Sequence, residues 1–371
     1  MKKKLIFLIP TLKHGGAEKV LVNLVNNLNP EKYDITVQTI FDVGVHRDAL
    51  KKHIHYRAWL KKEFRGNNPL FQLFSPEFLW KRMVKGHYDV AISYLEGPTN
   101  RILSGCGDPC TKRVAWIHTA MDTDKVFSVG FRSTKEAAQR YSGFDRVIAV
   151  SRKVKDCFLG HFDAPPIVDV LYNTNETEQI REKSMLPVDD TRFPKDGITV
   201  CSVGKLIRIK GFDRLLNVHK RLLSEGYDHK ICILGIGEEQ KALEREIAQY
   251  GVQDSFLLLG YQDNPYKYVS KCDLYVCSSV REGFSTAVTE ALVVGTPVVS
   301  TDCSGAKELL GENNEYGIVV DNSEEGIYQG MKKMLSDPAL LAHYKEKAKE
   351  RGSFFSREQT VKAVEEMLDN L

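Results

Sequence analysis

Two glutamates bracket the stretch REGFSTAVTE, because Glu282 lies near its start and Glu290 at its end. Gly283 follows the first glutamate and would let a ligand approach the backbone closely. The free N–H groups of a helix's first turn bind phosphate oxygens, reinforced by the helix dipole. Glu290 would then accept hydrogen bonds from a ribose diol, and Glu282 from the hydroxyls of a sugar beyond the phosphate. The spacing predicts a nucleotide-sugar site.

The helix in this stretch is expected to start near Phe284 or Ser285 and to run to Gly295, after the strand-like run DLYVCSS. In open parallel sheets, ligands bind beyond the carboxyl ends of the strands. The expected donor contacts here are Gly283, Phe284, Ser285, Thr286 and Glu290. A structural alternative is that Glu282 only introduces the helix and that Glu290 is a surface residue.

Three cations crowd the loop after another strand-like run, in SVGKLIRIKGF. Gly204 permits a turn, and Lys205, Arg208 and Lys210 follow it. Charge-assisted hydrogen bonds from such side chains hold a diphosphate. A solvated basic loop is the structural alternative.

Two further strand ends offer contacts to a nucleotide. ILGIGEE holds Gly235 and Gly237, which allow close backbone approach, although it lacks the third glycine of a dinucleotide fingerprint. In LGYQDNP, Tyr261 would lie at the edge of a base, and a plain turn is the alternative.

The elements that would position these residues alternate along the chain. Amphipathic helical stretches such as 17–28, 212–226 and 238–250 separate the strand-like runs. These runs are 4–9, 34–40, 89–95, 112–118, 146–151, 197–204, 229–237, 255–260, 273–279, 296–301 and 317–320. This alternation predicts parallel sheets with right-handed crossovers. A chain of 371 residues also exceeds the roughly 250–300 residues at which one core stops growing. We therefore predict an α/β protein with two doubly wound, Rossmann-like domains.

Polar residues and prolines interrupt this pattern at 171–197, which predicts a linker and domain entry. The N-terminal domain is expected at 1–173, for the acceptor, and the C-terminal domain at 174–355, for the donor. The last stretch, 356–371, begins with a helix-capping Ser356 and would pack back onto the first domain.

The composition, 42% hydrophobic and 27% charged, is typical of a soluble globular protein, and no apolar run reaches the ~20 residues of a membrane span. The start resembles a secretory signal, but its apolar run is short and leads through Gly15 and Gly16 into a helix, so a buried strand and phosphate-type turn are favoured. Cysteines within strand-like runs suit a reduced cytoplasm. Cys106 and Cys110 lack the second pair that a metal site would need.

The formal net charge of +3 divides unevenly, because the first half is basic and the second acidic. Residues 51–85 hold nine Lys and Arg against Glu63 and Glu77, interleaved with aromatic residues. This pattern indicates an interfacial segment on an anionic membrane surface, and a core-packed helix with a solvated face is the alternative. No recognition motif supports nucleic-acid binding.

The motifs and their order resemble the retaining nucleotide-sugar glycosyltransferases of the GT-B superfold, family 4, also called glycosyl transferases group 1. This resemblance implies the GT-B fold, in which the two Rossmann-like domains face a central cleft. The resemblance rests on Glu282, seven residues and Glu290 in REGFSTAVTEALVVGTPVVSTDCSGAKELL. Supporting matches are HGGAEKVLVNL (14–24), AWIHT (115–119), VIAVSRKVKD (147–156), SVGKLIRIKGFDRLL (202–216) and EYGIVV (315–320). They cover almost the whole chain.

The resemblance implies transfer of a sugar from a nucleotide diphosphate sugar, UDP favoured over GDP, to a glycan or lipid-linked acceptor in cell-surface synthesis. It implies retention at the anomeric carbon and neither a metal nor another cofactor. Lys205 and Lys210 match the pair that neutralises the leaving diphosphate, Glu290 the ribose-binding acid and Glu282 the sugar-binding one. Gly15 and Gly16 would approach the donor phosphate, and His118 matches a cleft histidine near the sugar. The expected location is cytoplasmic or peripheral on the inner face of the cell membrane.

The sequence departs from the family pattern at three places. Lys205 stands where arginine is commoner, GIG replaces Gly-Asp-Gly, and YNTNET replaces the usual hinge motif, which puts the hinge geometry in doubt. Three alternatives stay open: a nucleotide-sugar epimerase of the same superfold, a non-catalytic sugar-nucleotide binding protein, and a metal-dependent transferase using Asp122 and Asp124.

Overall fold

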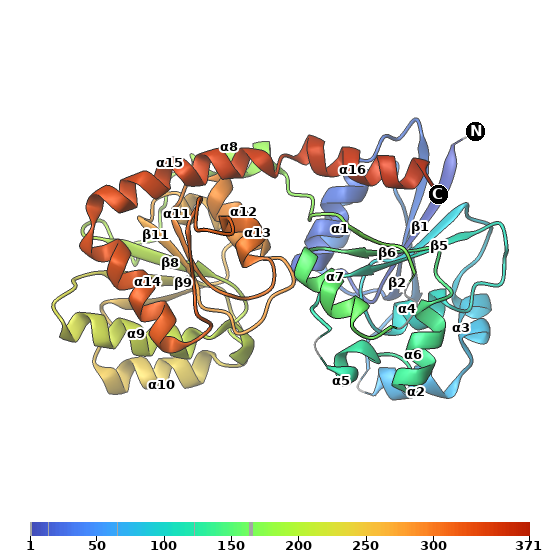
Figure 1. Ribbon diagram of the computed structural model, residues 1–371, viewed down its shortest axis with the longest axis horizontal. Coiled ribbons are helices and arrows are strands. Elements are labelled where there is room, and N and C mark those ends of the chain that lie inside the picture. Colours follow the sequence, from blue (N-terminus) through green and yellow to red (C-terminus); the bar gives the residue numbers. More distant parts are fainter. Residues whose placement is uncertain (1, 14, 65, 122, 163–165) are drawn as a thin grey trace. The chain divides into compact units, whose positions relative to one another are not determined.

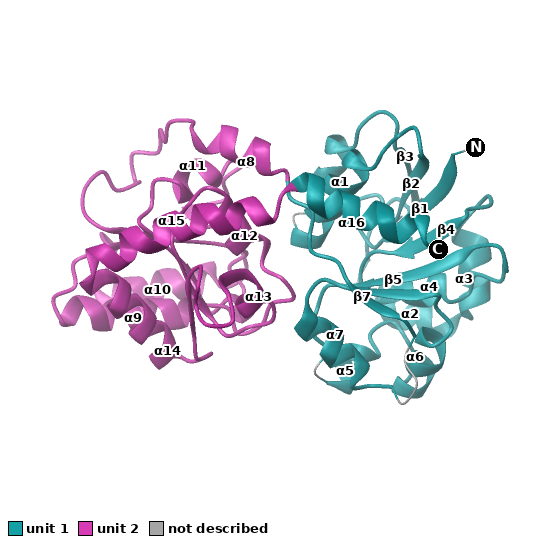
Figure 2. Ribbon diagram, turned by 45° about the horizontal axis from the view of Figure 1, so that its top comes forward, with its two compact units in different colours: residues 1–175, 357–371 teal, residues 176–356 magenta. Residues whose placement is uncertain are grey.

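Two compact units make up the protein in a computed structural model that describes residues 2–13, 15–64, 66–121, 123–162 and 166–371 (Figure 1, Figure 2). Unit 1 holds Met1–Asn175 with Arg357–Leu371, and unit 2 holds Glu176–Ser356. The boundaries expected from the sequence, after residues 173 and 355, lie within two residues of these.

Unit 1 is built on a parallel sheet in the order β3-β2-β1-β4-β5-β6-β7. Its strands are β1 (Lys3–Ile9), β2 (Tyr33–Phe41), β3 (His55–Leu60), β4 (Val90–Ser93), β5 (Lys112–Ile117), β6 (Arg146–Ala149) and β7 (Val168–Val170). Parallel strands covered on both faces are continuously apolar, and residues 5–9 of β1 are fully buried. The order reverses between β1 and β4, so the loops after these strands lie at the switch point where such sheets bind ligands.

The helices of unit 1 include α16, the C-terminal one, which packs near the start of β2. Tyr33 Oη donates to Asp369 Oδ1 at 2.8 Å, and the N–H of Asn29 donates to Glu365 Oε1 at 2.7 Å. The bounds are α1 (Gly16–Asn27), η1 (Val45–Ala49), α2 (Asn67–Leu73), α3 (Pro76–Met83), α4 (Pro98–Leu103), α5 (Asp124–Phe127), α6 (Thr134–Tyr141), α7 (Arg152–Leu159) and α16 (Arg357–Asp369).

Unit 2 repeats the architecture with a parallel sheet in the order β10-β9-β8-β11-β12-β13. Its strands are β8 (Thr199–Val203), β9 (Lys230–Leu234), β10 (Phe256–Gly260), β11 (Leu274–Cys277), β12 (Val298–Thr301) and β13 (Ile318–Val320). β8 pairs with β9 on one side and β11 on the other. The switch point of this sheet therefore lies between β8 and β11.

Helices cover both faces of this second sheet. Figure 1 shows α9, α10 and α14 on one face and α8, α11 and α12 on the other. The bounds are α8 (Thr177–Ser184), η2 (Arg208–Lys210), α9 (Phe212–Ser224), α10 (Gln240–Tyr250), α11 (Tyr266–Val269), α12 (Thr286–Val293), α13 (Ala306–Leu310), α14 (Glu324–Ser336) and α15 (Pro338–Phe354). Within the described ranges, no helix is both long and apolar enough to cross a bilayer.

The two parallel sheets confirm the predicted α/β class and the doubly wound organisation of each domain. β3 and β7 are not among the predicted strands, and α8 lies in the stretch predicted as a linker. β3 is an edge strand of mixed exposure inside the basic segment, and β7 is three residues long. Neither gives the continuous apolar run that marks a central strand.

A buried histidine pair lies beside α9. His219 Nδ1 is 2.9 Å from His229 Nε2, and His219 Nε2 is 2.9 Å from Ser255 Oγ. Burial lowers the pKa of His219 to about 3, with the charge of His229 as the smaller cause. Burial also lowers the pKa of His229. The folded protein therefore keeps both rings neutral at pH values where exposed histidines are charged.

Stability is expected to fall as the pH drops below about 6.5, because unfolding then exposes histidines that bind protons. Each extra proton bound on unfolding lowers the free energy of unfolding by about 1.4 kcal/mol per pH unit. Urea unfolding between pH 7 and pH 5 measures this slope. The variant His219→Gln/His229→Gln should show a shallower slope, and equal slopes would contradict the assignment.

Candidate functional site

The loops after β8 and β11 meet at the switch point of unit 2. The first loop contains η2 with Lys210, and the second contains Glu282. Lys210 Nζ donates to Glu282 Oε1 at 2.6 Å, and Ser279 Oγ donates to the same oxygen at 2.7 Å. The fold thus joins two predicted site residues that are 72 positions apart.

Lys210 is a charged group in partly dry surroundings, with side-chain exposures of 23% for Lys210 and 14% for Glu282. Burial opposes the charge of Lys210, but the Glu282 carboxylate outweighs it and raises the pKa of the lysine. The ammonium is therefore cationic at neutral pH. An anionic ligand that reaches the pair would compete with the Glu282 carboxylate for the Lys210 ammonium.

Backbone contacts fix the two loops against each other. Gly211 ends η2 at φ +64°, and a Cβ there would lie 2.3 Å from the carbonyl oxygen of Ser278. Ser278 Oγ donates to the Lys210 carbonyl at 2.9 Å, and the N–H of Val280 donates to the Ile209 carbonyl at 2.8 Å. This close approach requires glycine and sets the position of Lys210.

Gly235 and Gly237 have a packing explanation of their own. A Cβ on Gly235 would lie 1.9 Å from the carbonyl oxygen of Gly204, and one on Gly237 would lie 2.3 Å from that of Leu206. The loops after β8 and β9 therefore interlock through their backbones, which accounts for these glycines without a ligand. Their contact with a nucleotide stays a prediction.

The remaining cations of the first loop are open to solvent. Lys205 and Arg208 are exposed, and neither forms an ion pair within the part of the chain that the structure describes. Tyr261, directly after β10, is also exposed. These three side chains are thus accessible at the carboxyl edge of the sheet, where the sequence places the diphosphate and the base.

Helix α12 begins beside Glu282, and Ser285 caps it by accepting from the N–H of Val288 at 3.4 Å. Glu290 is 8% exposed and accepts a hydrogen bond from Tyr266 Oη at 3.2 Å. The surface-residue alternative for Glu290 is therefore wrong. A buried carboxylate held in this way has a defined position for recognising a hydroxyl.

The side chain of Phe284 is directed into unit 2 rather than toward a ligand. Its ring is buried and packs edge-on against Phe355, with the centroids 5.7 Å apart. Contact of the Phe284 backbone with a donor stays a prediction. Gly283 and Thr286 are partly exposed on either side of it.

In unit 1, Gly15 and Gly16 lie at the switch point, after β1. Gly15 is the N-cap residue of α1 and provides no side-chain cap, and Gly16 is the exposed first residue of the helix. The Glu18 carboxylate lies against this end of α1, because a Cβ built on Gly15 would overlap Glu18 Oε2. The predicted contact of Gly15 and Gly16 with a donor phosphate stays a prediction. His14, which starts the matched motif, lies outside the described residues.

His118 directly follows β5 and packs against Tyr94, with the ring centroids 4.9 Å apart. Burial lowers the pKa of His118 to about 3, so its imidazole is neutral at pH 7. Its Nε2 atom is buried without a hydrogen-bond partner among the described residues. The ring is thus a neutral group with one unused nitrogen.

Glu96, which the sequence reasoning missed, holds the backbone of this loop. Its Oε1 accepts the N–H of His118 at 2.9 Å and also the N–H of Thr119. Burial raises the pKa of Glu96, and the two amide donors oppose that rise. An acid directly after a strand, in SYLEG, is the signal that could have identified it. Ser279 and Tyr266 were missed as well, since their roles appear only through their partners.

Glu96→Ala is expected to lower the free energy of unfolding by about 1–3 kcal/mol, because it leaves two buried amide donors without an acceptor. Glu96→Gln keeps a carbonyl oxygen in place and should lose less. Urea unfolding of both variants measures the difference. Equal stability of the alanine variant and wild type would show that water replaces the carboxylate.

The metal-dependent alternative gains no geometric support. Asp122 lies outside the described residues, and Asp124 begins α5 with a mostly exposed side chain. Cys106 is buried and Cys110 is exposed. Within the described ranges, no three or more His, Cys, Asp or Glu side chains gather as a metal site would need.

Comparison with known proteins follows the two units. The family model described as Glycosyltransferase Family 4 matches residues 14–179, and that described as Glycosyl transferases group 1 matches residues 188–351. The chain is 28% identical, over 96% of both chains, to the "N-acetylgalactosamine-N,N'-diacetylbacillosaminyl-diphospho-undecaprenol 4-alpha-N-acetylgalactosaminyltransferase" of Campylobacter jejuni. It is 29% identical, again over 96% of both, to the "Lipopolysaccharide core biosynthesis glycosyltransferase LpsE" of Rhizobium meliloti.

Solved structures agree on the architecture. The crystal structure of Anabaena Alr3699/HepE in complex with UDP matches the whole of both chains with a TM-score of 0.77 at 19% identity. The resemblance predicted from the motifs is thereby confirmed at the level of family and fold. The chain belongs to the family 4 glycosyltransferases, which have the GT-B fold.

Proposed function

We propose that the protein transfers a sugar from a UDP-sugar to a glycan or lipid-linked acceptor in cell-surface polysaccharide or glycoconjugate synthesis. The observation that carries this proposal is the Lys210–Glu282 pair at the switch point of unit 2. UDP in the HepE structure supports the choice of donor. The names of the Campylobacter and Rhizobium relatives support the class of acceptor.

In this proposal, Lys210 exchanges Glu282 for the diphosphate of the donor. The exchange frees Glu282 to accept hydrogen bonds from the sugar. Breaking this one ion pair therefore makes Lys210 available to the diphosphate and Glu282 available to the sugar. Lys205 and Arg208, which form no competing ion pair in the described part of the chain, add charge to the same loop. Charge-assisted hydrogen bonds are about twice as strong as neutral ones.

The other ends of the donor are bound by groups of fixed position. Glu290, held by Tyr266, accepts the ribose hydroxyls, and the first turn of α12 binds a phosphate oxygen. The assignment of Gly15 and Gly16 in unit 1 to a donor phosphate also belongs to this proposal, because the sequence motif that holds them matches the family. His118 contributes a neutral imidazole, which hydrogen-bonds a sugar hydroxyl without adding charge.

We further propose that the reaction retains the anomeric configuration and needs no metal ion. The bond between the anomeric carbon and the phosphate oxygen breaks while the acceptor oxygen bonds to the same face of the sugar. The departing phosphate takes the acceptor's proton. Lys210 and Lys205 stabilise the charge that develops on the diphosphate, so catalysis rests on positioning and electrostatics. The enzyme would work in the cytoplasm, peripherally on the inner face of the cell membrane.

Release of UDP from a UDP-sugar, with and without candidate acceptors, tests this function. Transfer predicts release that depends on an acceptor, a product with the donor's anomeric configuration by NMR, and full activity in a chelator. An epimerase would alter the sugar without an acceptor, and a binding protein would release nothing. Inversion of the anomeric centre or loss of activity in the chelator would overturn the proposed mechanism.

A further inference from the structure

The corner between α2 and α3 of unit 1 exposes a cluster of apolar side chains. Leu70 is 39% exposed, Leu73 73%, Phe74 40% and Phe78 47%. Leu70, Leu73 and Phe74 recur at helical spacing, and the rings of Phe74 and Phe78 stack at 5.2 Å. Phe71 is buried. We call the four exposed residues the apolar corner; clusters of this kind mark interaction surfaces.

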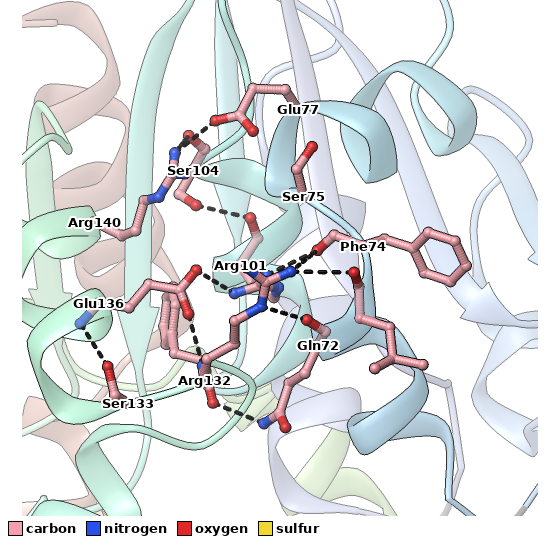
Figure 3. A network of polar contacts seen from close by, with 12 residues as sticks. Gln72, Phe74, Ser75, Glu77, Arg101, Ser104, Arg132, Ser133, Glu136 and Arg140 are labelled. Atoms are coloured by element: carbon pink, nitrogen blue, oxygen red, sulfur yellow. Dashed lines mark hydrogen bonds and ion pairs between the residues drawn. The ribbon is translucent and has the colours of Figure 1, made fainter.

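One buried and one exposed arginine hold this corner in place (Figure 3). Arg101 is fully buried, pairs with Glu136 at 2.6 Å and donates to the carbonyl of Phe74 at 2.8 Å. Arg132 donates to the carbonyl of Leu73 at 3.1 Å. Figure 3 shows the ring of Phe74 directed away from both guanidinium groups. The two arginines thus fix the backbone carbonyls at the end of α2. The apolar corner therefore has a defined conformation before any partner binds.

The charges around the corner are not balanced within the segment. Its two acids are already paired with cations from elsewhere in unit 1, Glu63 with Lys13 and Glu77 with Arg140. Several of its own cations are exposed and form no ion pair in the described part of the chain: Lys61, Lys62, Lys81 and Arg82. The surface therefore combines exposed apolar groups with uncompensated positive charge.

Lys81 and Arg82 follow Phe78 on α3 by three and four residues and so lie on the same face of the helix. We propose that the apolar corner inserts into the interface of an anionic membrane while Lys81 and Arg82 contact the lipid headgroups. This inference rests on the proposed function, because a lipid-linked acceptor is presented at such a surface. Anionic lipid provides both an apolar layer and diffuse negative charge. Not every aromatic residue of the predicted interfacial segment 51–85 can reach a membrane. Trp59 packs against the buried Phe71, with ring centroids 5.8 Å apart, so we assign membrane insertion to the apolar corner alone.

Co-sedimentation with vesicles tests the proposal. Wild type should pellet with equimolar phosphatidylglycerol and phosphatidylcholine, and stay in the supernatant with phosphatidylcholine alone. Leu73→Ser/Phe78→Ser should weaken binding at least about tenfold through lost apolar burial. Lys81→Glu/Arg82→Glu should weaken it at least about 25-fold, since each cation near the surface contributes about fivefold.

Matched controls alter comparable residues in unit 2. Met185→Ser/Leu186→Ser removes other exposed apolar groups, and Lys271→Glu/Lys345→Glu makes the same change of charge. Both control variants should bind vesicles as wild type does. Wild type that ignores anionic vesicles, or corner variants that pellet as wild type does, would overturn the proposal. A corner that instead mediates self-association, seen as a mass change by light scattering without vesicle binding, would also overturn it.

The UDP-induced shift of the melting temperature separates this proposal from the proposed function. The corner variants should keep the wild-type shift, because none of the substituted residues belongs to unit 2. Vesicle binding without any UDP shift would leave the membrane surface standing and count against the UDP-sugar donor. A UDP shift without vesicle binding would support the UDP-sugar donor and overturn the membrane surface.

Discussion

Lys210→Ala is expected to lower kcat about 10²–10³-fold, the usual cost of removing one preorganised group that stabilises charge developing in a transition state. In the protein without donor, the Glu282 carboxylate raises the pKa of Lys210, so the lysine is already charged when the diphosphate takes the place of that carboxylate. Initial rates of UDP release with saturating donor and acceptor measure the effect. Lys271→Ala, which changes an exposed lysine of the same unit, should leave the rate unchanged.

Stability measurements separate the catalytic role of Lys210 from its pairing with Glu282. Lys210→Ala leaves a carboxylate that is 14% exposed without its cation, which should cost about 1–3 kcal/mol of stability. The double variant Lys210→Met/Glu282→Gln removes both charges and should recover much of that loss while staying inactive. Recovery of activity along with stability would show that Lys210 serves the fold alone.

The architecture was readable from the sequence because buried parallel strands are apolar throughout. ICIL and LYVC are apolar throughout, VCSV holds a single serine, and each strand of the second sheet was predicted. Once two doubly wound sheets are expected, the residues after the strands become site candidates through geometry alone. This is why Lys210 and Glu282 were both found although they are far apart in the chain.

The pairing of these residues was not readable, and neither was the role of Glu96. Glu96 binds backbone N–H groups, and every residue but proline has one, so no partner residue type marks the contact. Gly235 shows a related limit. The absence of a side chain admits a ligand or a neighbouring backbone equally, and the structure places the carbonyl of Gly204 there. Sequence thus locates the edge of the sheet where a ligand would bind. It does not show which polar groups at that edge are already bound to other parts of the protein, because those contacts join distant residues.

Glu290→Ala is expected to raise the Kd for UDP by about 10–100-fold, because a hydrogen bond to a charged group contributes about 1.5–3 kcal/mol. UDP at 100 times the wild-type Kd stabilises the folded protein by about 2.7 kcal/mol. A Kd that is 100-fold higher would reduce this at the same concentration to about 0.4 kcal/mol. A Kd that is 10-fold higher would leave about 1.4 kcal/mol. Thermal unfolding with and without UDP therefore shows a shift for the variant that is at most about half that of wild type.

Two companion variants identify the source of the loss. Tyr266→Phe removes the hydroxyl that donates to Glu290 at 3.2 Å but keeps the carboxylate, so it should weaken UDP binding less than Glu290→Ala does. Glu312→Gln, at an exposed position of the same unit, should behave as wild type. If Glu290→Ala kept the full UDP shift while Lys210→Ala abolished it, the diphosphate would be bound as proposed but the ribose would lie elsewhere, because the proposal assigns the two residues to different parts of the nucleotide.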